Sequence, residues 1–265
     1  MYPRTVEVDG FALPAISLPG GAQRLPGWHH ITPHASGVRE YQAGDPLNRI
    51  HWPSTARTSR LMVKEFDLDP VPDVWLFLDM SESVQRGVGD ESTEEYGVVA
   101  AASLAQHFLR QGRAVGLVAS GGTVCVLSPD RGERQLLRVL EELAVVRAEG
   151  NVSLAETIEA EGNRCTRRAA VVVITPSVEE DWVAGVQELR QRGIRAAAVL
   201  LEAGTFGVQD DLAEGMKAPV SAPGGSLGVL AALAAAEVPV HLLKCGDSLE
   251  RALSGSGAGH LRVLR

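Results

Sequence analysis

Short runs of consecutive apolar residues alternate along the chain with longer segments whose apolar residues recur every three or four positions. Such runs predict buried strands of a parallel sheet, and the longer segments predict amphipathic helices. The alternation starts at Asp73. The predicted strands are 74–79, 114–119, 123–127, 169–175, 195–201 and 238–243. The predicted helices run from Ser92 to Gly112 and over 133–147, 153–161, 179–192 and 226–236, with a short one near 247–253.

Repeated strand–helix units predict an α/β fold, because each right-handed crossover returns the chain to the same sheet. We therefore expect a doubly wound, mostly parallel sheet with helices on both faces. Residues 1–36 are rich in Pro, Gly and His and predict an extended arm or a partial strand layer. The predicted division is an N-terminal segment of residues 1–72 and an α/β domain of residues 73–265.

A candidate binding site follows the first predicted strand. The apolar run at 75–78 ends at Asp79, and the hydroxyls of Ser81 and Ser83 follow at every second position. Ligands of open α/β sheets gather beyond the carboxyl ends of strands, and one carboxylate with two hydroxyls suits Mg²⁺. Asp and Ser are also common after strands as turn formers and helix caps, so this second interpretation stays open.

The segment 37–66 interleaves cations with aromatic residues. Between positions 39 and 64, five cations stand against two acids, in a chain whose net charge is −8. In one interpretation the arginines pair with internal carboxylates and stack on Trp52, which ties the segment to the domain. In the other, the arginine forks bind an acidic partner or a phosphate. The residues concerned are Arg39, Glu40, Tyr41, Asp45, Arg49, His51, Trp52, Arg57 and Lys64.

The same segment resembles the signature of the "domain of unknown function 58" family. The resemblance rests on Arg39-Glu40-Tyr41, Gly44-Asp45, Arg49-Ile50-His51-Trp52, Ala56-Arg57 and Leu61-Met62-Val63-Lys64-Glu65, followed by the Asp-x-Ser-x-Ser spacing at Asp79. It extends from about residue 30 to the last predicted strand. It implies a von Willebrand factor type A-like, Rossmann-like domain with a metal-ion-dependent adhesion site.

The resemblance also implies how that metal site is completed, namely by a Thr from a second loop and an Asp from a third. Val152 stands at the Thr position with Ser153 beside it, and Thr175-Pro176 stands where the carboxylate is expected. These departures favour a degenerate site in which Asp79 and the hydroxyls cap backbone amides. Weak Mg²⁺ binding through Asp79, with most of the ion's waters kept, is the alternative.

A protein partner is the main functional implication of the resemblance. Such proteins accompany a MoxR-type AAA+ ATPase, for which the von Willebrand A-like domain is an adaptor without catalysis of its own. Relatives carry transmembrane helices and a small β domain before the signature, and residues 2–8 resemble the end of that β domain. We therefore expect either a piece of a membrane-tethered protein or a naturally short member of the family. A tethered form would act at the cytoplasmic face.

Composition narrows the function classes. The net charge of −8 argues against a general nucleic-acid surface, and no run of about 18 apolar residues predicts a membrane span. The three cysteines are widely spaced and odd in number, which fits neither a disulfide framework nor a zinc site. A reducing, cytoplasmic setting is the expectation.

One motif argues for an enzyme. Residues 224–228 match Gly-x-Ser-x-Gly around Ser226, and Asp247 and His260 follow in the order of α/β hydrolases. The residues before Ser226 predict a loop instead of the strand that a nucleophile elbow needs, so Ser226 is predicted to cap the following helix. A serine or metal-assisted hydrolase is thus the alternative to the interaction module, and a purely structural scaffold is the third hypothesis.

Overall fold

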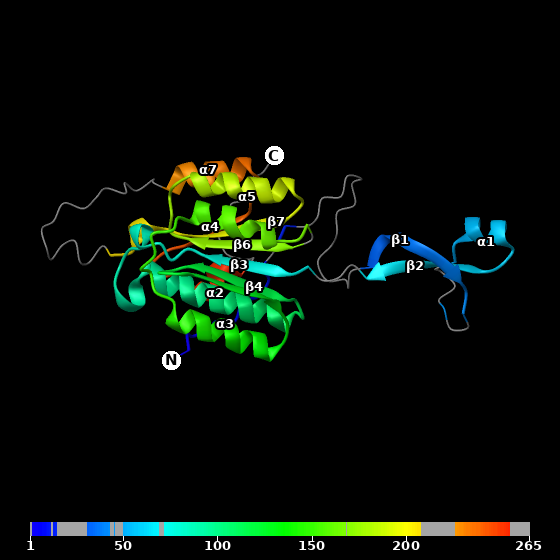
Figure 1. Cartoon of the computed structure of the whole chain (residues 1–265), viewed down its shortest axis with the longest axis horizontal. Coiled ribbons are helices and arrows are strands. Elements are labelled where there is room, and N and C mark those ends of the chain that lie inside the picture. Colours follow the sequence, from blue (N-terminus) through cyan, green and yellow to red (C-terminus); the bar gives the residue numbers. More distant parts are fainter. Residues whose placement is uncertain are drawn as a thin grey trace, which may run out of the picture. The chain divides into compact units, whose positions relative to one another are not determined.

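The computed structural model describes residues 2–11, 13–14, 31–42, 45, 50–68, 72–167, 169–207 and 226–254 (Figure 1). The chain forms two compact units, of which the smaller is Ser17–Val71. The larger combines Met1–Ile16 with Pro72–Arg265. One boundary between the units lies between Val71 and Pro72, and residues 1–16 group with the α/β unit.

The larger unit is built on a six-stranded sheet in the order β5-β4-β3-β6-β7-β8. Numbered along the unit, this is the 3-2-1-4-5-6 order of doubly wound folds. Only the edge strand β5 is antiparallel to its neighbour. The predicted fold class is therefore confirmed. The strands are β3 Val74–Leu78, β4 Val115–Ser120, β5 Val124–Asp130, β6 Ala170–Thr175, β7 Arg195–Leu201 and β8 Val240–Leu243.

Helices cover both faces of this sheet (Figure 1). One face carries α2 Thr93–Arg110, α3 Glu133–Val145 and α8 Leu249–Leu253, and the other carries α4 Leu154–Glu161, α5 Asp181–Gln191 and α7 Ser226–Ala235. Short 3₁₀ helices lie in the loops: η2 Glu82–Val84, η3 Gly89–Glu91, η4 Gly162–Arg164 and η5 Ala203–Thr205.

The core explains why the central strands are apolar without alternation. In β3, Val74, Leu76 and Leu78 join the cluster under α2, while Trp75 and Phe77 join the cluster on the opposite face. Because both faces of the sheet are covered, every position of such a strand is buried. The predicted strands agree closely with the observed ones, and the largest difference is β5, which continues to Asp130.

Residues 2–11, here called the N-terminal strap, pack against the larger unit in extended form. The Val6 amide donates to the Ser103 hydroxyl on α2 at 3.0 Å. Phe11 is buried and stacks on His241 of β8, with ring centroids 4.4 Å apart. The strap is thus part of the core of this unit, which explains why it separates from the segment that follows it in sequence.

The smaller unit contains β1 Ile31–Glu40 and β2 Met62–Leu68, which pair antiparallel, and α1 Trp52–Thr58 between them. The end of the predicted arm is therefore a strand, while residues 15–30 lie outside the described residues. Helix α1 has no buried residue. Within the described part of the chain, no helix combines the length and the apolar character that crossing a membrane requires.

Candidate functional site

The carboxyl ends of β3 and β6 bring Asp79 and Thr175 together. Leu78 pairs with Ile174 in the parallel register, so the residues that follow are neighbours. The Thr175 hydroxyl donates to Asp79 Oδ2 at 2.6 Å, and the Ser81 amide donates to Asp79 Oδ1 at 3.1 Å. Asp79 is only 2% exposed. Both carboxylate oxygens therefore accept hydrogen bonds from the chain itself.

Burial raises the pKa of Asp79 above its usual value. The hydrogen bonds from Thr175 and Ser81 act in the opposite direction, and the charges of Glu179 and Asp181 raise the pKa further. Removing a carboxylate from water disfavours its charged form, and neighbouring acids add to that effect. The ionised form of Asp79 is therefore held mainly by its two hydrogen bonds.

The two predicted hydroxyl ligands lie on the same loop but differ in exposure. Ser81 is buried and Ser83 is exposed, and their Oγ atoms are 3.2 Å apart. Ser81 also forms an isolated parallel bridge with Gly150, whose carbonyl accepts from the Glu82 amide at 2.9 Å. The structure thus brings Asp79 and the two serines together, with only the Ser83 hydroxyl at the rim. We call the loop from Asp79 to Ser83, together with residues 177–181, the crest.

The second loop of the expected metal site has another task. Ser153 caps α4: its Oγ accepts from the Glu156 amide at 3.2 Å, and the Glu156 carboxylate accepts from the Ser153 amide at 2.9 Å. This reciprocal pair is a complete capping box. In the third loop, the Thr175 hydroxyl donates its hydrogen bond to Asp79. Among the described residues, no group of three or more His, Cys, Asp or Glu side chains is placed to hold a metal ion.

Sequence reasoning missed two partners of Asp79. In the sequence, Thr175 is only the residue that stands where a carboxylate is expected. Its position at the carboxyl end of a strand, like that of Asp79, is the signal that could have paired the two residues. Gln85 donates from Nε2 to the Asp79 carbonyl at 2.9 Å and accepts from the Thr93 hydroxyl at 2.6 Å. This chain of bonds connects the crest to the start of α2, and nothing local in the sequence marks it.

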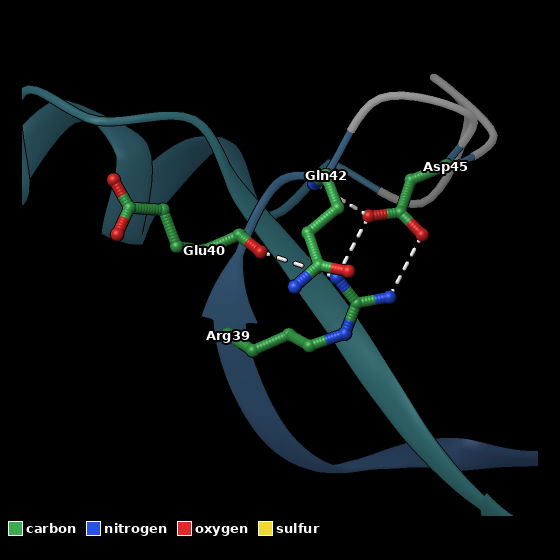
Figure 2. Close-up of polar contacts among 4 residues, drawn as sticks. All are labelled: Arg39, Glu40, Gln42 and Asp45. Atoms are coloured by element: carbon green, nitrogen blue, oxygen red, sulfur yellow. Dashed lines mark hydrogen bonds and ion pairs between the residues drawn. The ribbon is translucent and has the colours of Figure 1, made fainter.

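In the smaller unit, Arg39 and Asp45 form a two-pronged ion pair (Figure 2). Both guanidinium–carboxylate distances are 2.7 Å, and the Gln42 amide donates to the same carboxylate at 2.8 Å. Arg39 also donates to the Glu40 carbonyl at 3.1 Å. Figure 2 shows the Glu40 carboxylate pointing away from this fork; it forms an ion pair with Arg60 at 3.5 Å. The fork joins two residues of the smaller unit, next to the end of β1.

The start of α1 is capped by His51, whose Nδ1 accepts from the Ser54 amide at 3.3 Å. The next residue, Trp52, is 65% exposed. Within the described residues no cation stacks on Trp52, and Arg57 in the last turn of α1 has no ion pair. The predicted stacking of arginines on Trp52 is therefore wrong for this part of the chain, because α1 turns that ring outward.

The remaining signature residues add little to a site. The Tyr41 amide donates to the Leu61 carbonyl at 2.8 Å, which extends the pairing of β1 with β2. Arg49 and the side chain of Lys64 lie outside the described residues.

The hydrolase motif does not assemble in the described part of the chain. Ser226 is the first residue of α7 and is nearly buried. Asp247 accepts from the Lys244 amide at 3.0 Å within a turn and has no hydrogen bond with Ser226. His260 and the residues leading to Ser226 lie outside the described residues.

The strand order, the helix layers and the crest after β3 define a von Willebrand A-like α/β domain. The chain belongs to the family described as "Protein of unknown function DUF58", whose model matches residues 37–202. It is 29% identical over 156 residues to "Uncharacterized protein YeaD" of Bacillus subtilis (strain 168), and the match covers 58% of this chain and 37% of YeaD. The chain thus spans well under half of that relative.

Solved structures show a looser likeness of fold. "Conserved hypothetical protein BatB from Bacteroides thetaiotaomicron" aligns with a TM-score of 0.46 at 15% identity, covering 68% of this chain and 93% of that one. "SpRpn10 VWA domain" aligns with a TM-score of 0.42 at 13% identity, covering 69% and 93%. The family assignment comes from the sequence match and not from these superpositions.

Proposed function

We propose that this chain is a non-catalytic protein-interaction module and that its partner is a MoxR-type AAA+ ATPase, as the family resemblance implies. The observation that carries the proposal is the state of Asp79. Its two carboxylate oxygens accept hydrogen bonds from Thr175 and Ser81, so Asp79 is not available as a reactive group. The crest is then a surface for contact with a partner. Around it, Glu82, Ser83 and Glu179 are exposed.

The crest is, in this proposal, a degenerate metal-ion-dependent adhesion site. Mg²⁺ would bridge a carboxylate of the partner to the oxygens of such a site, but the residues present fit the ion poorly. The single carboxylate already accepts two hydrogen bonds, burial raises its pKa, and Val152 replaces the expected hydroxyl. A divalent ion that sheds its waters needs more oxygen ligands than this. Exposed side chains of the crest therefore make the contact without a metal.

A second contact in this proposal involves α1. Trp52 is largely exposed and Arg57 lies on the same short helix without an ion pair among the described residues. Trp and Arg dominate the binding energy of many interfaces because they combine a large contact area with directional polar groups. The charge of Arg57 favours an acidic surface of the partner.

The proposed setting is the cytoplasm, including the cytoplasmic face of a membrane where a longer form is tethered. The cysteines support a reducing compartment. Cys125, Cys165 and Cys245 are all free, and burial raises the pKa of Cys165 to about 12. A thiol with a raised pKa is a poor nucleophile, and a fold with free cysteines does not need disulfide bonds for its stability.

Affinity capture from the native cells tests the partner. We expect the full chain to recover a MoxR-type AAA+ ATPase, identified by mass spectrometry, and the double variant E82R/E179R to recover at least tenfold less. Glu188→Arg is the matched control, since Glu188 is exposed in the half of α5 distant from the crest. Recovery of no AAA+ ATPase by the wild-type chain would refute the partner. Equal recovery by the double variant would refute the crest as the contact.

A further inference from the structure

A cavity of about 460 Å³ lies between the start of the N-terminal strap, the first half of α2 and the end of α3. Its floor is apolar, because the side chains that line it there are buried core residues: Val98, Val99, Leu143 and Leu249. The volume falls in the usual range of small-molecule sites, about 300–1,000 Å³. The cavity is therefore large enough for a small ligand with an apolar body.

The walls of this cavity carry charges of both signs, and each sign comes from different segments. Asp90, Glu94 and Glu95 belong to α2 and to the turn before it. Arg147 follows α3, and Arg4 belongs to the strap. All five side chains are exposed or partly exposed, so a ligand from solvent has access to them.

The charges on these walls do not pair with one another. Within the described part of the chain, no ion pair joins any of the three acids to either arginine. The Arg147 guanidinium instead donates to the carbonyl of its neighbour Val146 at 3.1 Å. Opposite charges that line a common cavity without pairing are available to a ligand that carries both signs.

Contacts outside the cavity hold the acidic wall in place. The Ser92 hydroxyl accepts from the Glu95 amide at 3.1 Å, which fixes the start of α2. The Tyr96 hydroxyl accepts from the Gly246 amide at 3.0 Å, and its ring meets that of Phe206 edge to face, with centroids 5.0 Å apart. The acidic wall is thus formed before a ligand arrives, which lowers the entropic cost of binding.

We propose that this cavity binds a zwitterionic ligand with an apolar body, of the class of a short peptide. The ammonium group of the ligand pairs with the acids of α2. Its carboxylate pairs with Arg147 and Arg4, because the planar fork of a guanidinium matches carboxylate oxygens. The apolar side chains of the ligand lie on the floor, where they are removed from water. The site is distinct from the crest and does not depend on the proposed partner.

Titration of the ¹⁵N-labelled full chain with leucyl-leucine tests the site, since this dipeptide carries both charges and two apolar side chains. Amide shifts in nuclear magnetic resonance spectra give the location and the dissociation constant. We expect saturable shifts in α2 and α3 and a dissociation constant of about 0.1–1 mM, as usual for a ligand of this size. N-acetyl-leucyl-leucine lacks the cation and leucyl-leucinamide lacks the anion, and each should bind at least fivefold more weakly. No saturable shift, or equal binding of the blocked peptides, would overturn the proposal.

Variants assign each charge of the ligand to its wall. In D90N/E94Q/E95Q, the preference for the free dipeptide over the N-acetyl peptide should fall below twofold. In R4Q/R147Q, the preference for the free dipeptide over the amide should fall in the same way. Each double or triple variant should keep the other preference, because it leaves the other wall unchanged.

Two matched controls alter exposed side chains that do not line the cavity, Glu188→Gln on α5 and Arg138→Gln on α3. Both controls should keep both preferences for the free dipeptide. Affinities are compared as ratios between peptides within each protein, so a general change of stability cancels. Equal preferences in the wall variants and in the controls would show binding elsewhere on the chain and would overturn the proposal.

Discussion

The two ends of the parallel strands treat a buried charge in opposite ways. At the carboxyl ends, Asp79 is almost fully buried and its two oxygens accept hydrogen bonds from Thr175 and Ser81. At the amino ends, Arg113 and Arg195 each keep a buried nitrogen without a partner. A buried charge that accepts hydrogen bonds from the chain is stabilised by the fold, whereas a buried charged group without a partner lowers the stability of the fold.

Strand register accounts for this difference. β3 and β6 are adjacent, so a polar residue at the carboxyl end of each strand places a donor beside an acceptor. β4 and β7, by contrast, are separated by β3 and β6. Arg113, just before β4, and Arg195, at the start of β7, therefore do not stand on neighbouring strands. Among the described residues Asp73 stands in between, just before β3, but no ion pair joins it to either arginine.

The largest expected effect is the loss of Asp79. Asp79→Ala should reduce the free energy of unfolding by about 4 kcal/mol, because the Ser81 amide and the Thr175 hydroxyl would then be buried without an acceptor, at about 1–3 kcal/mol each, beside a small cavity. Urea unfolding followed by circular dichroism measures the change. Glu82→Ala, on the exposed rim of the same loop, should stay within about 0.5 kcal/mol of the wild type. Equal stability of D79A and E82A would mean that the hydrogen bonds of Asp79 do not stabilise the crest.

The N-terminal strap provides the next largest effect, on the side of the sheet that carries the arginines. Phe11 stacks on His241 and meets Phe108 edge to face, with centroids 5.9 Å apart. Phe11→Ala should therefore cost about 3 kcal/mol of unfolding free energy, the usual range for a buried aromatic ring. The exposed Tyr2 is the control, and Tyr2→Ala should cost less than about 0.5 kcal/mol. An unchanged stability of F11A would show that the strap does not belong to the core.

The protonation of Asp79 should be visible in the pH dependence of stability. Burial raises the pKa of Asp79 above 3.8 in the folded chain. Folding therefore takes up a proton at pH values between 3.8 and the raised pKa. The stability contributed by this proton is complete below 3.8 and is lost as the pH rises through the raised pKa. The unfolding free energy of the wild type, minus that of Asp79→Asn, should therefore fall with rising pH. The fall is about 1.4 kcal/mol for each unit by which the pKa is raised.

Urea titrations of both proteins across the acidic and neutral range measure this difference. The Asn variant has no titrating group at the position, so effects of other residues cancel. A difference that stays constant, or that grows as the pH rises, would contradict a raised pKa for Asp79.

The sequence predicted the parts of the fold that depend on local pattern. The apolar runs at β3, β6 and β7 are visible because strands buried on both faces need no polar positions. Asp79 was predicted at the edge of the sheet because it ends such a run. The smaller unit was recognisable from its motifs, but the outward position of Trp52 was not, since a seven-residue helix carries too little pattern to show which face is covered.

Contacts between distant parts of the chain were not predictable in the same way. Asp79 and Thr175 are 96 residues apart, and only the strand order makes them neighbours. The packing of Phe11 on His241 depends on a strap with no regular periodicity. The burial of a guanidinium nitrogen in Arg113 and in Arg195 also depends on packing between distant segments, and neither arginine stands out in sequence.

A smaller effect is expected at the second loop of the expected metal site, where Ser153 caps α4. Ser153→Ala should cost about 1 kcal/mol of unfolding free energy, the usual value of an N-cap. Ser153→Asn should restore most of this, because an amide oxygen accepts the same bond from the Glu156 amide. If Asn fails to rescue, Ser153 has a role other than capping.

The smallest expected effect is that of Mg²⁺, and it tests directly whether the crest binds a metal ion. Saturating MgCl₂ should change the thermal midpoint of the wild type by less than about 1 °C relative to NaCl of equal ionic strength, because an ion that binds only weakly adds little stability. Ser83→Ala, which removes the exposed hydroxyl and keeps Asp79, should respond in the same way. A rise of several degrees in the wild type that S83A loses would show a working metal site. The hydrogen bonds of Asp79 would then leave room for an ion, and the crest would differ less from a complete metal site.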